Sequence, residues 1–264
     1  TESVGGTYRI ASRARLPADI AFGQWRQNED AFIPFTTNTA IRTPSGASAA
    51  TLPLPADSLD GKIDTTSLNA FVTTRLTDDL GLHARYRRYE SDNKTPRYTV
   101  NGYVVFDSSF NATPRISVPY GYTNDFFDVY ATYGKGVLGL EAGWKSNGLK
   151  RTFRETGKTT ENVFRAAVDV RGSSLVFRGI GEFGSRDFDE YYAPLSEDAS
   201  FVSPGLPANQ TVLRRYDQAK RDLTRLGGTI EFSPGSGKAA LFASFVHTNF
   251  DYDQGAVPCD HVQD

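Results

Sequence analysis

The chain of 264 residues contains 39% hydrophobic residues, one cysteine (Cys259), three histidines and no methionine, and its formal net charge is −2. The near-neutral charge gives no support for nucleic-acid binding, one cysteine excludes an internal disulfide framework, and no stretch approaches the roughly 18 consecutive apolar residues of a membrane helix. A helical membrane protein is therefore excluded, whereas a membrane β-barrel is not, because alternating strands need only half of their residues to be apolar.

Segments in which apolar and polar residues alternate recur along the whole chain, whereas no window sustains the apolar spacing of an amphipathic helix. The alternation is clearest where Leu138, Leu140 and Ala142 share one side of a predicted strand. In chain order the predicted strands are 6–13, 18–26, 66–76, 79–90, 126–134, 137–145, 161–170, 174–184, 223–232 and 238–250. Their lengths are close to the roughly 9–11 residues that a tilted membrane strand needs. We therefore expect an all-β chain of about ten strands.

Short and long connections alternate between these strands. The predicted tight turns contain Gly, Asp and Ser, which suit hairpin geometry, and they lie at 77–79, 134–136, 171–174 and 233–237. The predicted long polar loops lie at 27–65, 90–125, 146–160 and 185–222. This organisation is typical of an outer-membrane barrel with short periplasmic turns and long outer loops. The expected fold is an antiparallel transmembrane β-barrel, of which this chain forms part.

The two faces of the predicted strands favour a membrane barrel over a soluble sheet. One face is apolar, and the other carries more charges of both signs than a dry core could hold, although a wet lumen could hold them. Arginine makes up 21 of the 29 basic residues, and its guanidinium suits cross-strand pairs with carboxylates. We expect ladders of balancing charges on a lumen-facing side that contains Arg85, Arg87, Asp128, Glu141, Arg165, Asp169, Arg178, Glu182, Arg225 and Glu231.

Aromatic residues gather near the ends of the predicted strands. Outer-membrane barrels carry girdles of aromatic side chains at both membrane interfaces. The residues expected to form such girdles are Trp25, Tyr86, Tyr89, Phe126, Phe127, Tyr133, Trp144, Phe232 and Phe250.

Several longer strings then suggest a family. They are QNEDAFIPFTTN at 27–38, followed by Leu52-Pro53, LDGKIDTT at 59–66, ARYRRYESDNKTP at 84–96 and RRYDQAKRD at 214–222. In this order they resemble the MtrB/PioB family of decahaem-associated outer-membrane proteins. The resemblance covers about residues 20–250, and it rests on loop and strand-end patterns.

The resemblance implies a large barrel in the bacterial outer membrane that sheathes a multihaem c-type cytochrome, so that electrons can cross the membrane. The haem would be supplied by the partner cytochrome, and the chain itself would be no enzyme. No catalytic, cofactor-binding or metal residue carries over from the family. The chain neither starts with methionine nor shows an export leader, so residues 1–264 are expected to be one barrel segment, incomplete at one or both ends.

Two matches to G-x-G-x-x-G, at 134–139 and 179–184, are interpreted as structural glycines. A dinucleotide site needs a helix that opens directly from this loop, so that its N-terminus binds pyrophosphate. The first match is predicted to be a hairpin turn and the second to lie inside a strand.

The remaining candidates for chemistry are isolated. His83, His247, His261 and Cys259 have no neighbouring residues in the sequence that would complete a haem, metal or hydrolase site. Acidic residues in predicted loops could bind a divalent cation, but solvating the loops is their expected role: Asp187, Asp189, Glu190, Asp251 and Asp253.

Two other functions stay open at this point. A general or substrate-specific porin would use the same charged lumen to pass small solutes. A soluble or surface β-sheet binding protein would use the same alternation with its apolar side turned inward.

Overall fold

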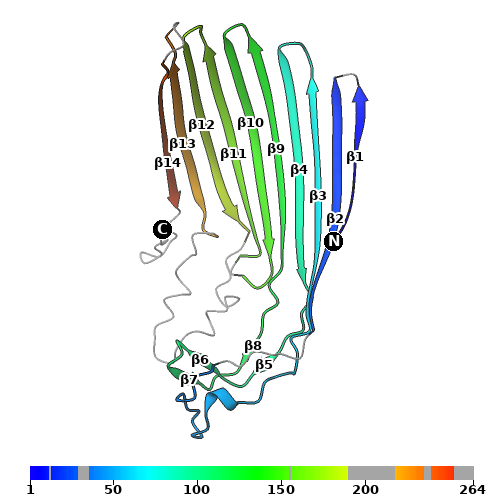
Figure 1. Ribbon diagram of the computed structural model, residues 1–264, viewed down its shortest axis with the longest axis vertical. Helices are drawn as coiled ribbons and strands as arrows, with labels where there is room; N and C mark the ends of the chain where they lie inside the picture. The colour runs from blue at the N-terminus through cyan, green and yellow to red at the C-terminus, as the bar shows by residue number, and fades with distance from the viewer. Residues whose placement is uncertain (12, 29–35, 155, 190–217, 235–238, 253–264) are drawn as a thin grey trace.

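The computed structural model describes residues 1–11, 13–28, 36–154, 156–189, 218–234 and 239–252. Ten strands form one sheet in which every neighbouring pair is antiparallel, in the order β1-β2-β3-β4-β9-β10-β11-β12-β13-β14 (Figure 1). Their bounds are β1 Glu2–Ala11, β2 Ala14–Gln27, β3 Gly61–Arg75, β4 Leu80–Asn93, β9 Tyr122–Lys135, β10 Leu138–Arg151, β11 Lys158–Arg171, β12 Leu175–Phe188, β13 Arg221–Phe232 and β14 Leu241–Tyr252.

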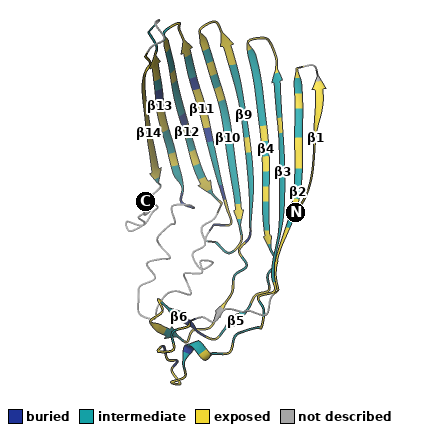
Figure 2. Ribbon diagram, in the orientation of Figure 1, coloured by how far each residue is buried: buried dark blue, intermediate teal, exposed yellow. Residues whose placement is uncertain are grey.

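The sheet confirms the prediction of an all-β chain with about ten strands. Each strand pairs with its neighbours in chain order, which is the up-and-down arrangement of membrane barrels. The sheet is not closed, since β1 and β14 each pair with one strand among the described residues. Figure 2 shows that exposed residues dominate these two edge strands. The described residues contain one short 3₁₀ helix, Ala49–Thr51, and no helix that is long and apolar enough to cross a membrane.

Two of the predicted long connections, between β2 and β3 and between β4 and β9, are bounded by strands that extend further than expected. The predicted loop at 185–222 lies mostly outside the described residues, although its ends belong to β12 and β13. The fourth prediction, a long loop at 146–160, is wrong, because β10 continues to Arg151 and β11 begins at Lys158. The predicted strand 6–13 is also wrong at its end, since β1 ends at Ala11 and β2 begins at Ala14.

The strands are longer than predicted because their loop-side ends are polar on both faces. In β10, Ser146 and Lys150 share one face, and Asn147 and Arg151 share the other. The apolar alternation therefore stops near Trp144, while the backbone pairing with β9 and β11 continues. A pattern of hydrophobicity detects only the part of a strand where the two faces meet different surroundings.

The first two long loops fold against each other at one end of the sheet (Figure 1). The second of them, between β4 and β9, contains two small hairpin-like pairs, β5 (Thr99–Val100) with β8 (Arg115–Ile116) and β6 (Tyr103–Val105) with β7 (Ser109–Asn111). The Thr36 hydroxyl donates to the Asp107 carboxylate at 2.7 Å, and the Tyr98 hydroxyl donates to the Leu59 carbonyl at 3.0 Å. These contacts join segments about 40 to 70 residues apart in sequence.

A buried polar contact joins the β10–β11 connection to the segment just before β13. The side chains of Thr156 and Gln218 are fully buried. Gln218 Oε1 accepts from the Thr156 backbone N–H at 3.0 Å and lies 3.1 Å from the Thr156 hydroxyl, which also donates. Two donors therefore depend on one amide oxygen away from water.

Replacement of Gln218 by alanine should lower the free energy of unfolding by about 1–3 kcal/mol, because the two Thr156 donors would lose their acceptor while buried. The measurement is urea unfolding of the full-length protein in detergent micelles or liposomes. Gln24→Ala is the matched control, since the exposed Gln24 amide donates to Asp64 at 2.6 Å and its loss should change stability by at most about 0.5 kcal/mol. Equal effects of the two substitutions would contradict this role of Gln218.

Candidate functional site: the charged face of the sheet

The register places all ten residues predicted to face the lumen on one side of the sheet. Directly opposed residues share a face, and the series Arg85, Asp128 and Lys145 runs across β4, β9 and β10. A second series joins Arg165, Glu182 and Arg225 across β11, β12 and β13. We call this side the charged face, and the opposite side, which carries Leu138, Leu140, Ala142 and Trp144 of β10, the apolar face.

Glu182 is the centre of the charged face. Its carboxylate lies 3.1 Å from the Lys145 ammonium and 3.5 Å from the Arg225 guanidinium, so it joins β10, β12 and β13. The residue is only 7% exposed, whereas both cations reach partly into solvent. A buried carboxylate of this kind is stable only while cations or donors stay beside it.

Further ion pairs flank Glu182 along the same face. Arg221 pairs with Glu161 at 2.7 Å, and Arg178 pairs with Asp169 at 3.8 Å. Arg165 pairs with Glu141. The prediction of balancing ladders is therefore confirmed for β10 to β13. The prediction missed Lys145, Glu161 and Arg221, although the alternation beginning at Leu138 already places Lys145 beside the selected charges.

The first four strands present a different charged face. It carries five exposed arginines, for which the described residues provide no carboxylate ion pair: Arg9, Arg15, Arg75, Arg85 and Arg87. Arg87 lies over the Phe126 ring, 4.8 Å from its centroid. Arg85 stands opposite Asp128 in register without a close contact between charged groups. The predicted ladders are thus absent among the described residues of this part.

The apolar face carries a continuous row of aromatic side chains across five strands. Trp144 stands directly opposite Phe164, which in turn stands opposite Phe183, and Tyr86 stands opposite Phe127. The Phe127 and Trp144 ring centroids are 5.6 Å apart. Beyond this row the same face becomes polar.

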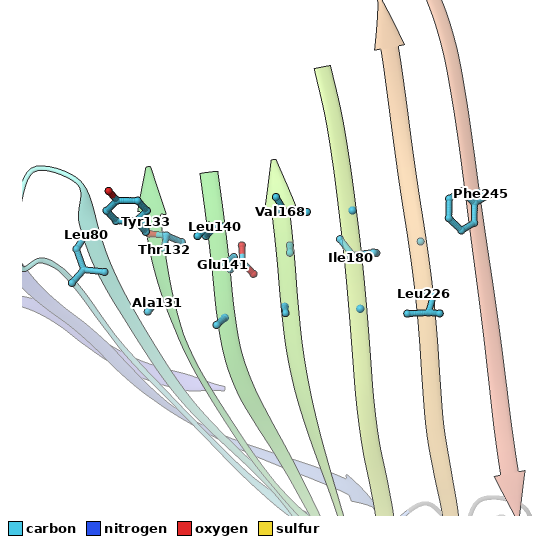
Figure 3. Close-up of a pocket in the computed structure, with 16 residues that line it drawn as sticks. Leu80, Ala131, Thr132, Tyr133, Leu140, Glu141, Val168, Ile180, Leu226 and Phe245 are labelled. Atoms are coloured by element: carbon cyan, nitrogen blue, oxygen red, sulfur yellow. The ribbon is translucent and has the colours of Figure 1, made fainter. Parts of the chain in front are cut away.

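The six residue steps from Leu138 to Trp144 span roughly 20 Å of strand, which is close to the roughly 25 Å apolar band of a membrane barrel. Large apolar side chains in this band remain open to the surroundings, and Phe164 is 63% exposed. A shallow hollow of about 760 Å³ lies in the same face (Figure 3). Leu80, Leu140 and Leu226 line it, together with small residues such as Ala142. This face has the dimensions and chemistry of a lipid contact.

The prediction of aromatic girdles is confirmed in part. Tyr86, Phe127, Tyr133, Trp144 and Phe232 lie on the apolar face. The prediction is wrong for the remaining four, which the register places on the charged face, where they cannot meet lipid: Trp25, Tyr89, Phe126 and Phe250. Successive residues of a strand point to opposite faces of the sheet. Proximity to a strand end therefore does not decide which face an aromatic ring occupies. The row also contains Phe164 and Phe183, which the prediction missed.

A small charged cluster lies just beyond β4, at the loop end of the sheet. The Lys94 ammonium donates to Asp64 at 2.8 Å and lies 3.3 Å from Asp92. The hydrogen bonds to Asp64 and then to Asp92 raise the pKa of Lys94 above its ordinary value. Lys94 is therefore a fixed cation that joins β3 to the segment after β4.

The other candidate residues are not brought together. His83 stacks on Tyr130 of the charged face, with ring centroids 4.5 Å apart, and His247 stands opposite Leu226 on the apolar face.

Asp187 pairs with Lys220 at 2.6 Å. Asp189 accepts from the Lys158 backbone N–H, and Asp251 lies near the end of β14 opposite Asp222. The described part of the chain holds no group of three or more His, Cys, Asp or Glu that could bind a metal ion. Glu190, Asp253, Cys259 and His261 lie outside the described residues.

Both glycine motifs are structural, as predicted. Gly136 has φ +57 and forms the turn between β9 and β10. Residues 179–184 lie inside β12. Neither segment is followed by a helix.

The family model of outer-membrane β-barrel porins named MtrB/PioB matches residues 2–255. The chain belongs to the MtrB/PioB family. It is also 29% identical to outer membrane protein MtrB of Shewanella baltica (strain OS185) over 186 residues, which are 69% of this chain and 25% of that protein. The chain thus spans about a quarter of the length of this relative.

Membership of the MtrB/PioB family places the chain in the bacterial outer membrane as part of a porin-like β-barrel. The alternative of a soluble binding protein is therefore wrong. Among solved structures, OmpT of Vibrio cholerae aligns with a TM-score of 0.43 and 12% identity, over 94% of this chain and 78% of that one. Its trimer form gives the same score over 94% and 80%.

Proposed function

We propose that the barrel to which this segment contributes encloses a multihaem c-type cytochrome and insulates it from lipid, so that electrons cross the outer membrane along the partner's haems. The observation that carries the proposal is the division of one sheet into an apolar face and a charged face, whose charges in β10 to β13 are held in ion pairs. Lipid is the solvent of the first face, and a polar protein surface suits the second.

The chain's own residues provide shape and charge in this proposal, and no redox or catalytic chemistry. Ion pairs such as Lys145–Glu182 and Arg221–Glu161 hold the charged side chains of neighbouring strands in place. A surface ordered in advance loses little conformational entropy when a partner docks. Haem belongs to the partner, so purified barrel without that partner should show no covalent haem absorbance.

A porin for small solutes is the second candidate, favoured by the porin description of the family. Conductance of the full-length protein in planar bilayers separates the two functions. A sheath should lose its conductance when the cytochrome that copurifies with it is added back, because the partner fills the lumen. A porin should keep its conductance, and this result would contradict the sheath.

A further inference from the structure

The charged face changes character between its two halves. In β10 to β13, carboxylates and cations pair across the strands, with Glu182 between Lys145 and Arg225 as the most buried case. In β1 to β4, the same face carries five arginines and one carboxylate, Asp19, which accepts from Asn69 at 2.9 Å. We call Arg9, Arg15, Arg75, Arg85 and Arg87 the arginine sector.

The arginines of this sector are held near one another by the register. Arg9 stands directly opposite Arg15, an arrangement in which like charges repel. Arg15 stands opposite Thr73, which lies two residues from Arg75 and opposite His83. The sector therefore has the cations that an ion-pair ladder needs, but the described residues provide no carboxylates in ion pairs with them. An anion that covered the sector would relieve the repulsion.

The sector also borders a polar hollow of about 880 Å³ at the turn ends of the strands. Arg15, Arg75 and His83 line it, together with Asp79 and Thr132. The hollow is open, so a partner's side chains can enter it.

The extent of the sector indicates the size of its ligand. Four neighbouring strands span roughly 14 Å, and the six residue steps that separate the levels of Arg75 and Arg87 span roughly 20 Å. A single small anion meets only one or two of these side chains. A folded protein surface with several carboxylates can meet all of them, since an interface side of standard size covers about 800 Å².

We propose that the arginine sector is a docking surface for an acidic patch of the protein held in the lumen. This inference rests on the proposed sheath function and specifies the partner's chemistry. The partner presents aspartate, glutamate or other carboxylate groups toward β1 to β4. Guanidinium groups bind such carboxylates in pairs of parallel hydrogen bonds.

The test uses the full-length protein purified together with its haem-containing partner. Arg15, Arg75, Arg85 and Arg87 are replaced by glutamine in one variant, and haem retained per barrel is measured while NaCl is raised. The partner's affinity should fall roughly tenfold or more, so that release occurs at lower salt than in the unsubstituted complex. A matched control replaces four cations on the opposite side of the sheet, and it should release haem as the unsubstituted complex does: Arg26, Lys135, Lys150 and Lys158.

Two further variants guard against a folding defect in the fourfold substitution. The pairs Arg15/Arg75 and Arg85/Arg87 are neutralised separately, and each should give a smaller shift in the same direction. Folding of each variant is checked by the heat-dependent gel mobility of the barrel. Unchanged retention in folded variants would overturn the docking surface and leave the sheath function standing.

Two other results would also overturn the inference, for different reasons. If the unsubstituted protein holds no haem partner at any salt concentration, the sheath function itself fails and the docking surface fails with it. If the variants keep the partner but the partner-free barrel loses a preference for chloride over potassium in bilayers, the sector serves small anions.

Discussion

Replacement of Leu140 by arginine is expected to lower the free energy of unfolding in a bilayer by about 2–4 kcal/mol, because Leu140 lies in the middle of the apolar band and faces lipid. The measurement is reversible urea unfolding of the full-length protein in liposomes. The cost arises from bringing a guanidinium into hydrocarbon, where only water defects or snorkelling can solvate it.

Thr132→Arg is the matched control for this prediction. Thr132 stands directly opposite Glu141, one residue from the level of Leu140, but on the charged face. An arginine there enters a polar environment beside a carboxylate, so the change should be less than about 1 kcal/mol. If both substitutions cost the same, the assignment of the two faces would be wrong.

The second large effect is expected when Glu182 loses both of its cations. In the double variant Lys145→Gln and Arg225→Gln, a carboxylate that is 7% exposed would remain without its two ion pairs. We expect a loss of about 2–3 kcal/mol. This is below the roughly 3–5 kcal/mol of a fully buried pair, because both cations are partly in solvent and Arg165 stands opposite Glu182 in register.

Glu182→Gln alone should cost only about 1 kcal/mol, because the two cations can turn toward water. The triple variant that combines all three substitutions should therefore be more stable than the double variant. Urea unfolding of the full-length protein in micelles measures all of these differences. If the triple variant is no more stable than the double variant, an unpaired Glu182 carboxylate is not what destabilises the double variant.

The sequence predicted the candidate site well wherever the two faces of a strand meet different surroundings. The ten charges assigned to the lumen all share one face, because an alternation of period two keeps every second residue on the same side. The prediction was poorer at the polar ends of the strands: Arg221, which pairs with Glu161, lies outside the predicted strand 223–232.

The pairing of charges could not be predicted for a different reason. Whether an arginine finds a carboxylate depends on the strand beside it and on the register, and neither is a local property of the sequence. Arg165 and Arg85 occupy similar positions in alternating strands, yet Arg165 pairs with Glu141, whereas Arg85 belongs to the unpaired sector. The same limit applies to Trp25 and Phe250, whose strand positions were evident and whose faces were not.

By itself, then, the sequence determined the fold class, the strand number and the two-sided character of the sheet, because these depend on local alternation and on turn residues. The family followed from its longer strings. The tertiary structure alone decided how far the strands extend, which loops pack together and where charge is left unbalanced. These features arise from hydrogen bonds and ion pairs between residues distant in sequence, as in Thr156 with Gln218 and Lys145 with Glu182.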